Sequence, residues 1–247
     1  MSGHIVVVGG TSRIAHLCLR QWAETGAPQV SLLGRNAERL AAIASDLVGR
    51  NREASVDVIQ QDLTDLAAIP AVIDRISSSR PPTIALVAHG YLPSSPVAEQ
   101  TIQELAETLT VTGCSAALYA EHLARAMQHD GGQLGIIGSV ASDRGRRQNY
   151  PYGAAKSMLA HYSQGLQHRY WRTPLSVTLI KPGPTDTPMT AGVPSATGRL
   201  ADPHDVASAI VRSMAKGKRL AYTPAVWGTL MLIIRSLPRP VFDRLNL

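Results

Sequence analysis

Cysteine is scarce in this sequence, which contains only Cys18 and Cys114 among its 247 residues. Two cysteines cannot form the disulfide framework of a small secreted protein, and no metal-ligand spacing surrounds either of them. We therefore expect two free thiols inside helices, no metal site, and a protein of a reducing compartment such as the cytoplasm.

Long apolar runs and low-complexity linkers are also missing. No run reaches the roughly 20 apolar residues that a helix needs to cross a bilayer. The first residues enter a strand pattern directly, without the features of a signal peptide. No stretch rich in Pro, Gly or Ser divides the chain, so we expect one large α/β domain over residues 1–223, followed by a distinct segment at 224–247.

Acidic residues are outnumbered: 18 Asp and Glu stand against 24 Lys and Arg, which gives a net charge of +6. Such a balance raises the question of nucleic acid as a partner. However, the arginines are spread widely, and the sequence has no recognised nucleic-acid module or aromatic-interleaved basic motif. We therefore expect no nucleic-acid partner. An anionic cofactor, an anionic substrate or an acidic membrane surface fits the charge better.

Short apolar runs alternate with helical patterns along the whole sequence. The predicted strands are residues 5–8, 30–33, 56–60, 84–88, 134–137, 177–180 and 220–222. The predicted helices include residues 14–25, 37–48, 66–77, 102–128 and 153–172. Continuous apolar strands that alternate with helices indicate a parallel sheet covered on both faces. The predicted fold is therefore α/β, a Rossmann-type doubly wound parallel sheet of about seven strands.

A glycine-rich turn follows the first predicted strand and opens the first helix. Glycines let the backbone turn tightly and approach a pyrophosphate, which then lies at the helix N-terminus. The residues expected to bind a dinucleotide here are Gly9, Gly10, Thr11, Ser12, Arg13 and Ile14.

The end of the second strand bears on the choice between NAD and NADP. Arg35, followed by Asn36, stands where an acidic residue would hold the ribose 2′-hydroxyl of NAD. Its guanidinium could bind a 2′-phosphate instead, and Arg13 could reach the same group. A solvated arginine at a strand end is the alternative, but two arginines that agree favour NADP(H).

Two later strand ends contribute further candidates for the cofactor site. Asp62, followed by Leu63, could accept a hydrogen bond from the adenine amino group or could cap the next helix. Ala88, His89 and Gly90 would lie along the cofactor. A histidine there invites a catalytic interpretation, but we favour backbone packing against the ribose.

Tyr152 and Lys156 stand four residues apart between a buried strand and a helix, and Ser139 lies at the end of that strand. One helical turn brings the ammonium close enough to lower the pKa of the phenol. Tyr152 would then be a proton donor near neutral pH, which the reduction of a carbonyl requires.

Together these residues resemble the single-domain short-chain dehydrogenase/reductases, and the resemblance covers essentially the whole chain. It implies that Tyr152 protonates the carbonyl oxygen during hydride transfer and that Ser139 orients this carbonyl. Lys156 would lower the pKa of Tyr152 and bind the nicotinamide ribose. The resemblance also implies assembly as a homodimer or homotetramer.

The segment after the sixth strand resembles the Pro-Gly segment of the same family, which contacts the nicotinamide carboxamide. Its residues expected at the cofactor are Pro182, Gly183, Thr185 and Thr187.

Three positions depart from the family pattern. Ala15 replaces the last glycine of the turn, and Ala88-His89-Gly90 replaces the usual Asn-Ala-Gly. Thr110 replaces the asparagine that helps to anchor a proton-relay water. We expect Thr110 to take its place among the catalytic residues through the geometry of its backbone.

Arg144, Arg146 and Arg147 lie on the loop before the tyrosine, which should border the substrate. Three cations there favour a phosphate-bearing substrate, and a solvated loop is the alternative. Residues 187–200 are rich in Thr, Pro, Ser and Gly and are expected to form a flap that closes over the pocket.

Shorter segments resemble a narrower group, the reductases of polyprenyl-phosphate-linked keto-sugars of the decaprenylphosphoryl 2-keto-pentose type. These segments are residues 9–15, 139–141, 144–147, 188–192 and the C-terminal tail. The leading hypothesis is therefore an NADPH-dependent carbonyl reductase that acts on a lipid-linked keto-sugar. A soluble ketoreductase of acyl, polyketide or secondary metabolism is an alternative, and so is an NADP-binding sensor or scaffold without turnover.

The C-terminal segment combines apolar residues with arginine. Pro224 is expected at the first position of a helix, and residues 225–234 are apolar nearly all round. The arginines that follow are Arg235, Arg239 and Arg244. Such a segment could lie on the inner face of the plasma membrane, with Trp227 at headgroup depth. The alternative is a helix buried against a sister subunit.

Overall fold

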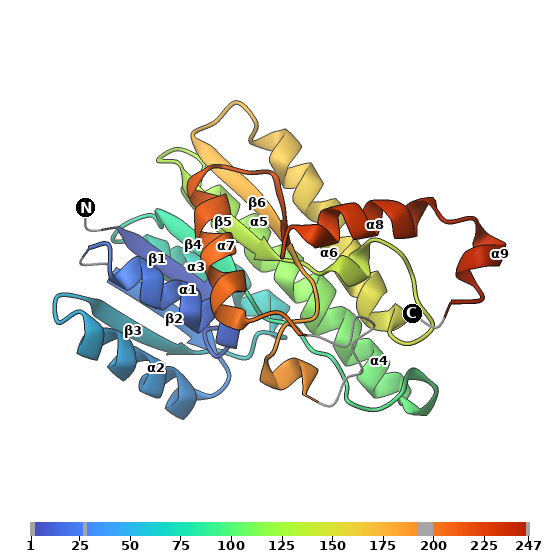
Figure 1. Ribbon diagram of the computed structural model, residues 1–247. Coiled ribbons are helices and arrows are strands. Elements are labelled where there is room, and N and C mark those ends of the chain that lie inside the picture. Colours follow the sequence, from blue (N-terminus) through green and yellow to red (C-terminus); the bar gives the residue numbers. More distant parts are fainter. Residues whose placement is uncertain (1–2, 27–28, 192–199, 246–247) are drawn as a thin grey trace.

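A seven-stranded sheet runs through the centre of the protein in the order β3-β2-β1-β4-β5-β6-β7 (Figure 1). The computed structural model describes residues 3–26, 29–191 and 200–245. All neighbouring strands pair in parallel. The strands are β1 His4–Val8, β2 Gln29–Gly34, β3 Ser55–Gln60, β4 Ile84–Val87, β5 Gly132–Ile137, β6 Leu175–Pro182 and β7 Leu220–Thr223. The predicted doubly wound parallel sheet is confirmed.

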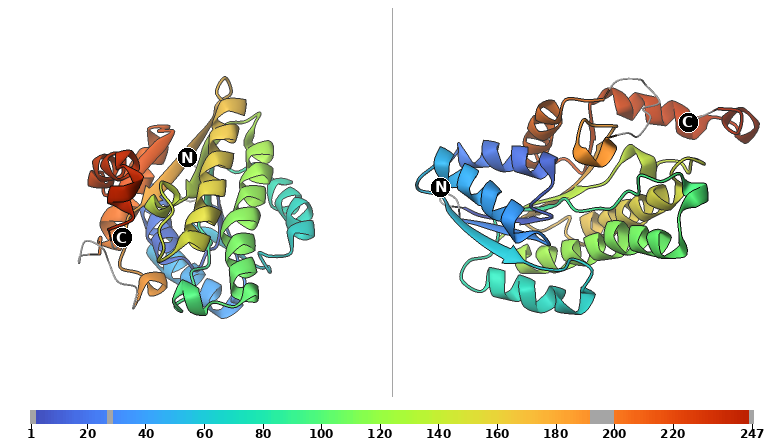
Figure 2. Two further views of the ribbon diagram at one scale, coloured as in Figure 1. Left: turned by 90° about the vertical axis from the view of Figure 1, so that its right-hand side faces the viewer. Right: turned by 90° about the horizontal axis from the view of Figure 1, so that it is seen from below.

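Helices cover both faces of the sheet (Figure 2). Helices α1, α2 and α7 pack on one face, and α3, α5 and α6 pack on the other, where α4 lies against α6. The helices of the described residues are α1 Arg13–Ala23, α2 Ala37–Arg50, α3 Ile69–Ser77, α4 Ile102–Leu109, α5 Ala116–Met127, α6 Tyr150–Arg169, α7 Pro203–Ala215, α8 Val226–Ser236 and α9 Arg239–Phe242.

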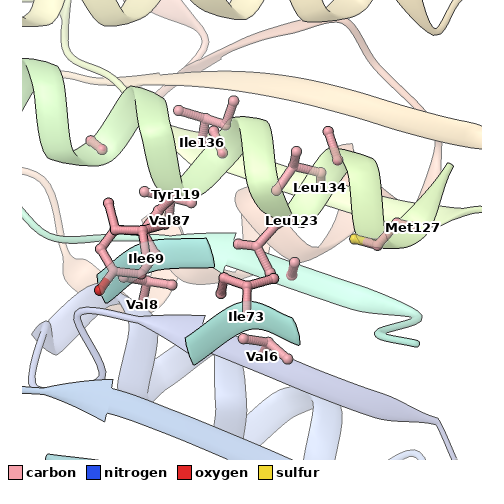
Figure 3. Packing of buried hydrophobic residues seen from close by; sticks show 14 of the residues in the cluster. Val6, Val8, Ile69, Ile73, Val87, Tyr119, Leu123, Met127, Leu134 and Ile136 are labelled. Carbon is pink, nitrogen blue, oxygen red and sulfur yellow. The ribbon is translucent and has the colours of Figure 1, made fainter. Parts of the chain in front are cut away.

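Strand β1 contributes to two separate hydrophobic clusters. Successive side chains of a strand point to opposite faces of the sheet. Val6 therefore joins the cluster beneath α3 and α5, whereas Val7 joins the cluster beneath α1 and α7. Figure 3 shows the first cluster, in which Ile73 and Leu123 fill the space between the helices and the sheet. Burial on both faces explains why the strand sequences are continuously apolar.

The direction of the strands decides where a site can form. Because all strands are parallel, the turns that follow them meet at one edge of the sheet. The strand order reverses between β1 and β4, so the chain leaves these two neighbours in opposite directions. A crevice forms at such a point, and it is the usual place for a ligand in this type of sheet.

The pattern over residues 102–128 predicted one long helix, but the structure divides it. Helix α4 ends at Leu109, a π-helical segment covers Thr110–Ser115, and α5 follows. A Cβ on Gly113 would lie 2.2 Å from Cε of Met158, so this glycine allows the segment to approach α6 closely. Apolar spacing does not distinguish a π turn from an α turn, and the division was therefore not predicted.

Other helix boundaries also differ from the expected ones. Residues 66–77 form a 3-10 turn followed by α3. Helix α7 was not among the predicted helices, although the carboxylate of Asp202 caps it and accepts a hydrogen bond from the backbone N of His204 at 2.7 Å. The C-terminal helix begins at Val226, two residues after Pro224, with Ala225 as its N-cap residue.

Candidate active site

The turn after β1 requires glycine for two reasons. Gly9 has a φ of +85°, which glycine adopts at little cost. A Cβ on Gly9 would also lie 2.6 Å from the backbone N of His89, so only glycine lets the turn approach the end of β4. The amides of Gly9 and Gly10 donate to the carbonyl oxygen of Leu33 at 3.0 and 2.9 Å, which holds the turn against β2.

A cleft with a volume of about 1120 Å³ opens beside this turn, at the carboxyl edge of the sheet. Most of the predicted site residues line it: Gly9, Thr11, Ser12, Arg13, Ile14, Arg35, Asn36, Leu63, Ala88, His89, Gly90, Ser139, Arg146, Arg147, Tyr152, Lys156, Pro182, Gly183, Thr185 and Thr187. Four predicted residues lie outside its wall, namely Gly10, Asp62, Thr110 and Arg144. Among the described residues, no group of three or more His, Cys, Asp or Glu side chains could hold a metal ion.

Ser139, Tyr152 and Lys156 meet in this cleft. Ser139 follows β5, whereas Tyr152 and Lys156 lie on consecutive turns at the start of α6. The side chains of Ser139 and Tyr152 form a hydrogen bond. The ammonium of Lys156 donates to the carbonyl oxygen of Ile137 at 2.7 Å and lies 5.8 Å from the centroid of the Tyr152 ring. The three residues grouped from the sequence are thus neighbours in space.

Burial decides the protonation of Tyr152 and Lys156. Burial raises the pKa of Tyr152 to about 12, and the hydrogen bond with Ser139 opposes only part of this rise. Burial lowers the pKa of Lys156 to about 8. We expected the ammonium to lower the pKa of the phenol, but burial dominates and the ammonium lies over the ring. The phenol therefore keeps its proton at neutral pH and can donate it.

His89 lines the cleft as a neutral, packed side chain. Its Nε2 lies 2.9 Å from the hydroxyl of Ser115, which itself donates to the carbonyl oxygen of Leu63 at 2.5 Å. Because that hydroxyl has one proton, Nε2 must be the donor in the first bond. Burial, followed by the charge of Lys156, lowers the pKa of His89 to about 3. A ring that stays neutral supports packing rather than proton transfer.

Thr112 of the π-helical segment is buried and is hydrogen-bonded to the backbone of Tyr91. A Cβ on Gly90 would lie 3.6 Å from both Nζ of Lys156 and Oγ1 of Thr112. The Thr112 hydroxyl donates to the carbonyl oxygen of Tyr91 at 3.0 Å and accepts from the backbone N of Tyr91 at 2.8 Å. Thr110 begins this segment and does not line the cleft, so its expected catalytic role stays a prediction.

The first turn of α2 supplies an arginine that the sequence analysis missed. Arg39 lines the cleft together with Arg13 and Arg35. It lies in the first turn of α2, where the side chain of Asn36 caps the helix by accepting from the backbone N of Arg39 at 2.8 Å. Arg39 follows Arg35 by four positions, about one helical turn, and this spacing could have indicated that both arginines reach the same part of the cleft.

Asp62 has a structural role in the turn after β3. Its carboxylate accepts from the backbone N of Thr64 at 2.9 Å and from the Thr64 hydroxyl at 2.7 Å, and these bonds lower its pKa. Thr64 and Leu63 line the cleft in its place. Asp62 binds the backbone of its own turn, as a capping residue does. The 3-10 turn that follows is capped by Asp65 instead.

The three arginines of the loop after Ser139 occupy different positions. Nη1 of Arg144 donates to the carbonyl oxygens of Ile234 and Leu237 at 2.5 and 2.8 Å, and its guanidinium stacks on Phe242 at 3.7 Å. Arg144 therefore binds the end of α8 instead of facing the cleft as expected. The other two arginines do line the cleft.

Arg146 has a poorly compensated charge. Its Nε is buried and has no hydrogen-bond partner within the described part of the chain. Burial lowers the pKa of its guanidinium, and the charge of Asp143 opposes this only in part. A desolvated cation at the wall of a cleft is suited to an anionic ligand.

Asp143 joins the loop after Ser139 to two strands. Its carboxylate forms an ion pair with Lys181 of β6 and accepts a hydrogen bond from the hydroxyl of Tyr222 in β7 at 2.8 Å. The side chains of Asp143 and Lys181 are only 2% and 9% exposed. The loop that follows Ser139 is thereby fixed to β6 and β7.

Trp227 is part of the cleft, which the sequence analysis did not foresee. We expected its indole at membrane headgroup depth, but it is buried, packs with Val140 and lines the cleft. A Cβ on Gly183 would lie 2.0 Å from Nε1 of Trp227, so this glycine makes room for the indole. An apolar sequence around a single tryptophan does not indicate which side of the helix turns inward.

The predicted flap is only partly within the described residues. Residues 192–199 lie outside them. The described part begins with a 3-10 turn at Pro188–Thr190 that Thr187 caps, and Thr187 and Met189 line the cleft.

Comparison with known proteins identifies the family. A family model described as short chain dehydrogenase matches residues 3–197, which is most of the chain. The chain belongs to this family. An uncharacterised oxidoreductase of Mycobacterium tuberculosis is 32% identical to this short-chain dehydrogenase over 98% of the chain and 96% of that protein. The family resemblance read from the sequence is therefore confirmed.

One further relative and two solved structures are similar to this chain. A cis-4-hydroxycyclohexanecarboxylate dehydrogenase of Sinomonas cyclohexanicum is 29% identical over 83% of this chain and 86% of that protein. A short-chain dehydrogenase of Burkholderia cenocepacia in complex with NADP has a TM-score of 0.82 at 19% identity, over 100% of this chain and 98% of that one. A variant of the actinorhodin polyketide ketoreductase with NADPH has a TM-score of 0.78 at 19% identity, over 90% of this chain and 95% of that one. The narrower resemblance to polyprenyl-linked keto-sugar reductases stays a prediction.

The contact between Gly183 and Trp227 can be tested by stability. Gly183→Ala should destabilise the protein by about 1–3 kcal/mol, because the added methyl group must displace the indole. Gly165→Ala is the matched control, since nothing lies within 4 Å of an added Cβ in α6. This change should stabilise the helix by about 0.5–1 kcal/mol. Urea unfolding measures both, and an unchanged midpoint for Gly183→Ala would contradict the contact.

Proposed function

We propose that this short-chain dehydrogenase is an NADPH-dependent carbonyl reductase. The observation that carries the proposal is the meeting of Ser139, Tyr152 and Lys156 at one wall of the cleft, with Tyr152 protonated and Lys156 buried. A phenol that keeps its proton, a hydroxyl beside it and a fixed ammonium are suited to protonate a carbonyl oxygen during reduction.

The backbone around the cleft fits a dinucleotide. Gly9 has no Cβ where the turn approaches the end of β4, and Gly90 lines the cleft beside Lys156, where an added Cβ would lie 3.6 Å from Nζ. The start of α1 would hold the pyrophosphate. Lys156 would hold the nicotinamide ribose. When bound, NADPH supplies the hydride that the carbonyl carbon accepts.

Three arginines support the phosphorylated form of the cofactor. Arg13, Arg35 and Arg39 line the cleft, where the start of α1 follows β1 and the start of α2 follows β2. Guanidinium groups bind phosphate through paired hydrogen bonds. The related structures in complex with NADP or NADPH agree with this choice.

The chain's own residues account for the proton. Tyr152 would donate its phenolic proton to the carbonyl oxygen as the carbonyl carbon is reduced, so no negative charge accumulates on the substrate. Ser139, which is hydrogen-bonded to Tyr152, would hold the same oxygen. The ammonium of Lys156 would stabilise the resulting phenolate by Coulomb attraction, held in place by the carbonyl oxygen of Ile137.

For the substrate we propose a phosphate-bearing, lipid-linked keto-sugar. Arg146 and Arg147 at the cleft wall support an anionic group, and apolar residues such as Leu92 and Met189 line the same cleft. A soluble ketoreductase is the second candidate, because a 29% identical relative is a dehydrogenase of a cyclic carboxylate. Arg146 could bind that anion equally well.

A lipid-linked substrate would place the enzyme at the inner face of the plasma membrane as a peripheral protein. The family resemblance implies a homodimer or homotetramer, which sedimentation velocity would measure. The sensor or scaffold without turnover is the remaining alternative, and the next experiment separates it from an enzyme.

Replacement of the proton donor tests the proposed reaction. Tyr152→Phe should lower kcat/KM for carbonyl reduction by about 10²–10⁴-fold, the usual contribution of a general acid. Its affinity for NADPH, measured by fluorescence titration, should not change. Tyr150→Phe is the matched control, because Tyr150 lies two residues earlier in α6 and is 55% exposed. Equal turnover in the two variants would favour the sensor or scaffold.

The rate of reduction should fall as the pH rises through about 8. Burial lowers the pKa of Lys156 to about 8, so its ammonium is charged below that pH and neutral above it. Tyr152 keeps its proton over this range because burial raises its pKa to about 12. Lys156→Arg should remove the loss of rate near pH 8, because a guanidinium stays charged. A loss at the same pH in Lys156→Arg would assign the titration to another group.

Substrate charge can be tested through Arg146. Arg146→Gln should raise KM for a phosphorylated keto-sugar by about 10–100-fold, the value of one charged hydrogen bond, and leave KM for a neutral ketone unchanged. Arg144→Gln is the control on the same loop, because Arg144 binds α8. It should not alter the preference for the phosphorylated over the neutral compound. An equal effect of Arg146→Gln on both substrates would remove the anionic group from the proposal.

A further inference from the structure

Helix α8 has two apolar faces, and only one is covered. Its inward face packs on the body of the protein through Trp227 and Met231. Its outward face exposes Val226, Leu232 and Ile233 by 67%, 63% and 56%. Figures 1 and 2 show α8 and α9 at one end of the molecule, beyond the sheet. Neighbouring exposed apolar residues of this size mark a contact with another apolar surface.

The charges next to this face are almost all positive. Arg235, Arg239 and Arg244 follow the apolar residues and are exposed. The sequence from residue 224 to residue 242 contains no acidic residue. Asp243 is the next acid, and it forms an ion pair with Arg239 at 3.7 Å. The segment therefore offers an apolar stripe beside a cationic end.

We propose that the outward face of α8 docks on an anionic membrane surface, with the arginines among the lipid headgroups. No helix within the described ranges has the length and apolar character needed to cross a membrane, so α8 would lie in the plane of the interface. Anionic headgroups complement the arginines. A second copy of this chain complements them less well, because a two-fold contact through α8 brings the same arginines of both copies to one interface.

The inward face of α8 connects this docking surface to the cleft. Trp227 lines the cleft, and Val140, the neighbour of Ser139, packs against the same face of the helix. Arg144 binds carbonyl oxygens at the end of α8, which keeps the helix and the loop after Ser139 in a fixed relation. One helix would thus contact the membrane on one side and the cleft on the other.

This arrangement deepens the proposed function and rests on it for the substrate. The polar head of a lipid-linked keto-sugar could enter the cleft from the surface while its hydrocarbon chain stays in the bilayer. Arg146, at the cleft wall, would meet the phosphate on the way.

The test is co-sedimentation of the full chain with vesicles. We expect binding to vesicles of phosphatidylglycerol mixed with phosphatidylcholine, and none to phosphatidylcholine alone. The double variant Leu232→Glu/Ile233→Glu should bind these vesicles with an affinity lowered more than about tenfold, because it places two anions on the docking face. Ile102→Glu is the matched control: Ile102 is 75% exposed, lies on α4, and should not affect binding.

Two results overturn the proposal. The wild-type protein could fail to sediment with anionic vesicles, or the double variant could bind them as well as the wild type does. Sedimentation velocity without vesicles tests the other occupant. If the double variant dissociates an oligomer that the wild type and Ile102→Glu both form, the face is a contact between copies and the membrane proposal is refuted.

Activity on a soluble ketone keeps this proposal separate from the proposed function. The double variant should melt at the temperature of the wild type and reduce a soluble ketone with NADPH at the same rate, because its substitutions lie on the exposed face. An active enzyme that does not bind vesicles refutes the docking alone. A protein that binds vesicles but reduces no carbonyl compound refutes the reductase alone.

Discussion

Parallel pairing of the strands is the constraint on which the cleft depends. Because every strand runs in the same direction, the turns after β1, β2, β4, β5 and β6 all reach one edge of the sheet. Residues far apart in the sequence thereby become neighbours. Gly9 and His89 show how closely the turns must meet, since no side chain fits between the backbone of one and that of the other. The position of the cleft is therefore set by the direction and order of the strands.

Burial gives the polar groups of the cleft their chemical character. Desolvation favours the neutral form of each group, so it raises the pKa of Tyr152 and lowers the pKa of Lys156. A buried ammonium is costly unless a partner compensates it, and the carbonyl oxygen of Ile137 supplies that partner. His89 stays neutral for the same reason. One environment thus holds a protonated phenol, a cation and a neutral imidazole side by side.

The sheet and the grouping of Ser139, Tyr152 and Lys156 could be predicted because local spacing encodes them. Continuous apolar runs mark buried strands, and a spacing of four positions places Tyr152 and Lys156 on adjacent turns of one helix. Contacts between distant segments could not be predicted in this way. Arg144 binds carbonyl oxygens some 90 residues later in the chain, and Trp227 turns inward only because the body of the protein offers it a place. The pKa of Lys156 depends on burial, which no motif records.

Asp143 limits how this scaffold can diversify. One carboxylate links the loop after Ser139 to Lys181 of β6 and Tyr222 of β7, and the adjacent Arg144 grips the C-terminal helix. A recombination event or a graft that exchanged residues 181–247 would have to preserve both attachments, or the imported segment would leave the buried carboxylate of Asp143 without its counter-ion. Sequence change is therefore most constrained at the joint that Asp143 and Arg144 form between the loop after Ser139 and the C-terminal part of the chain.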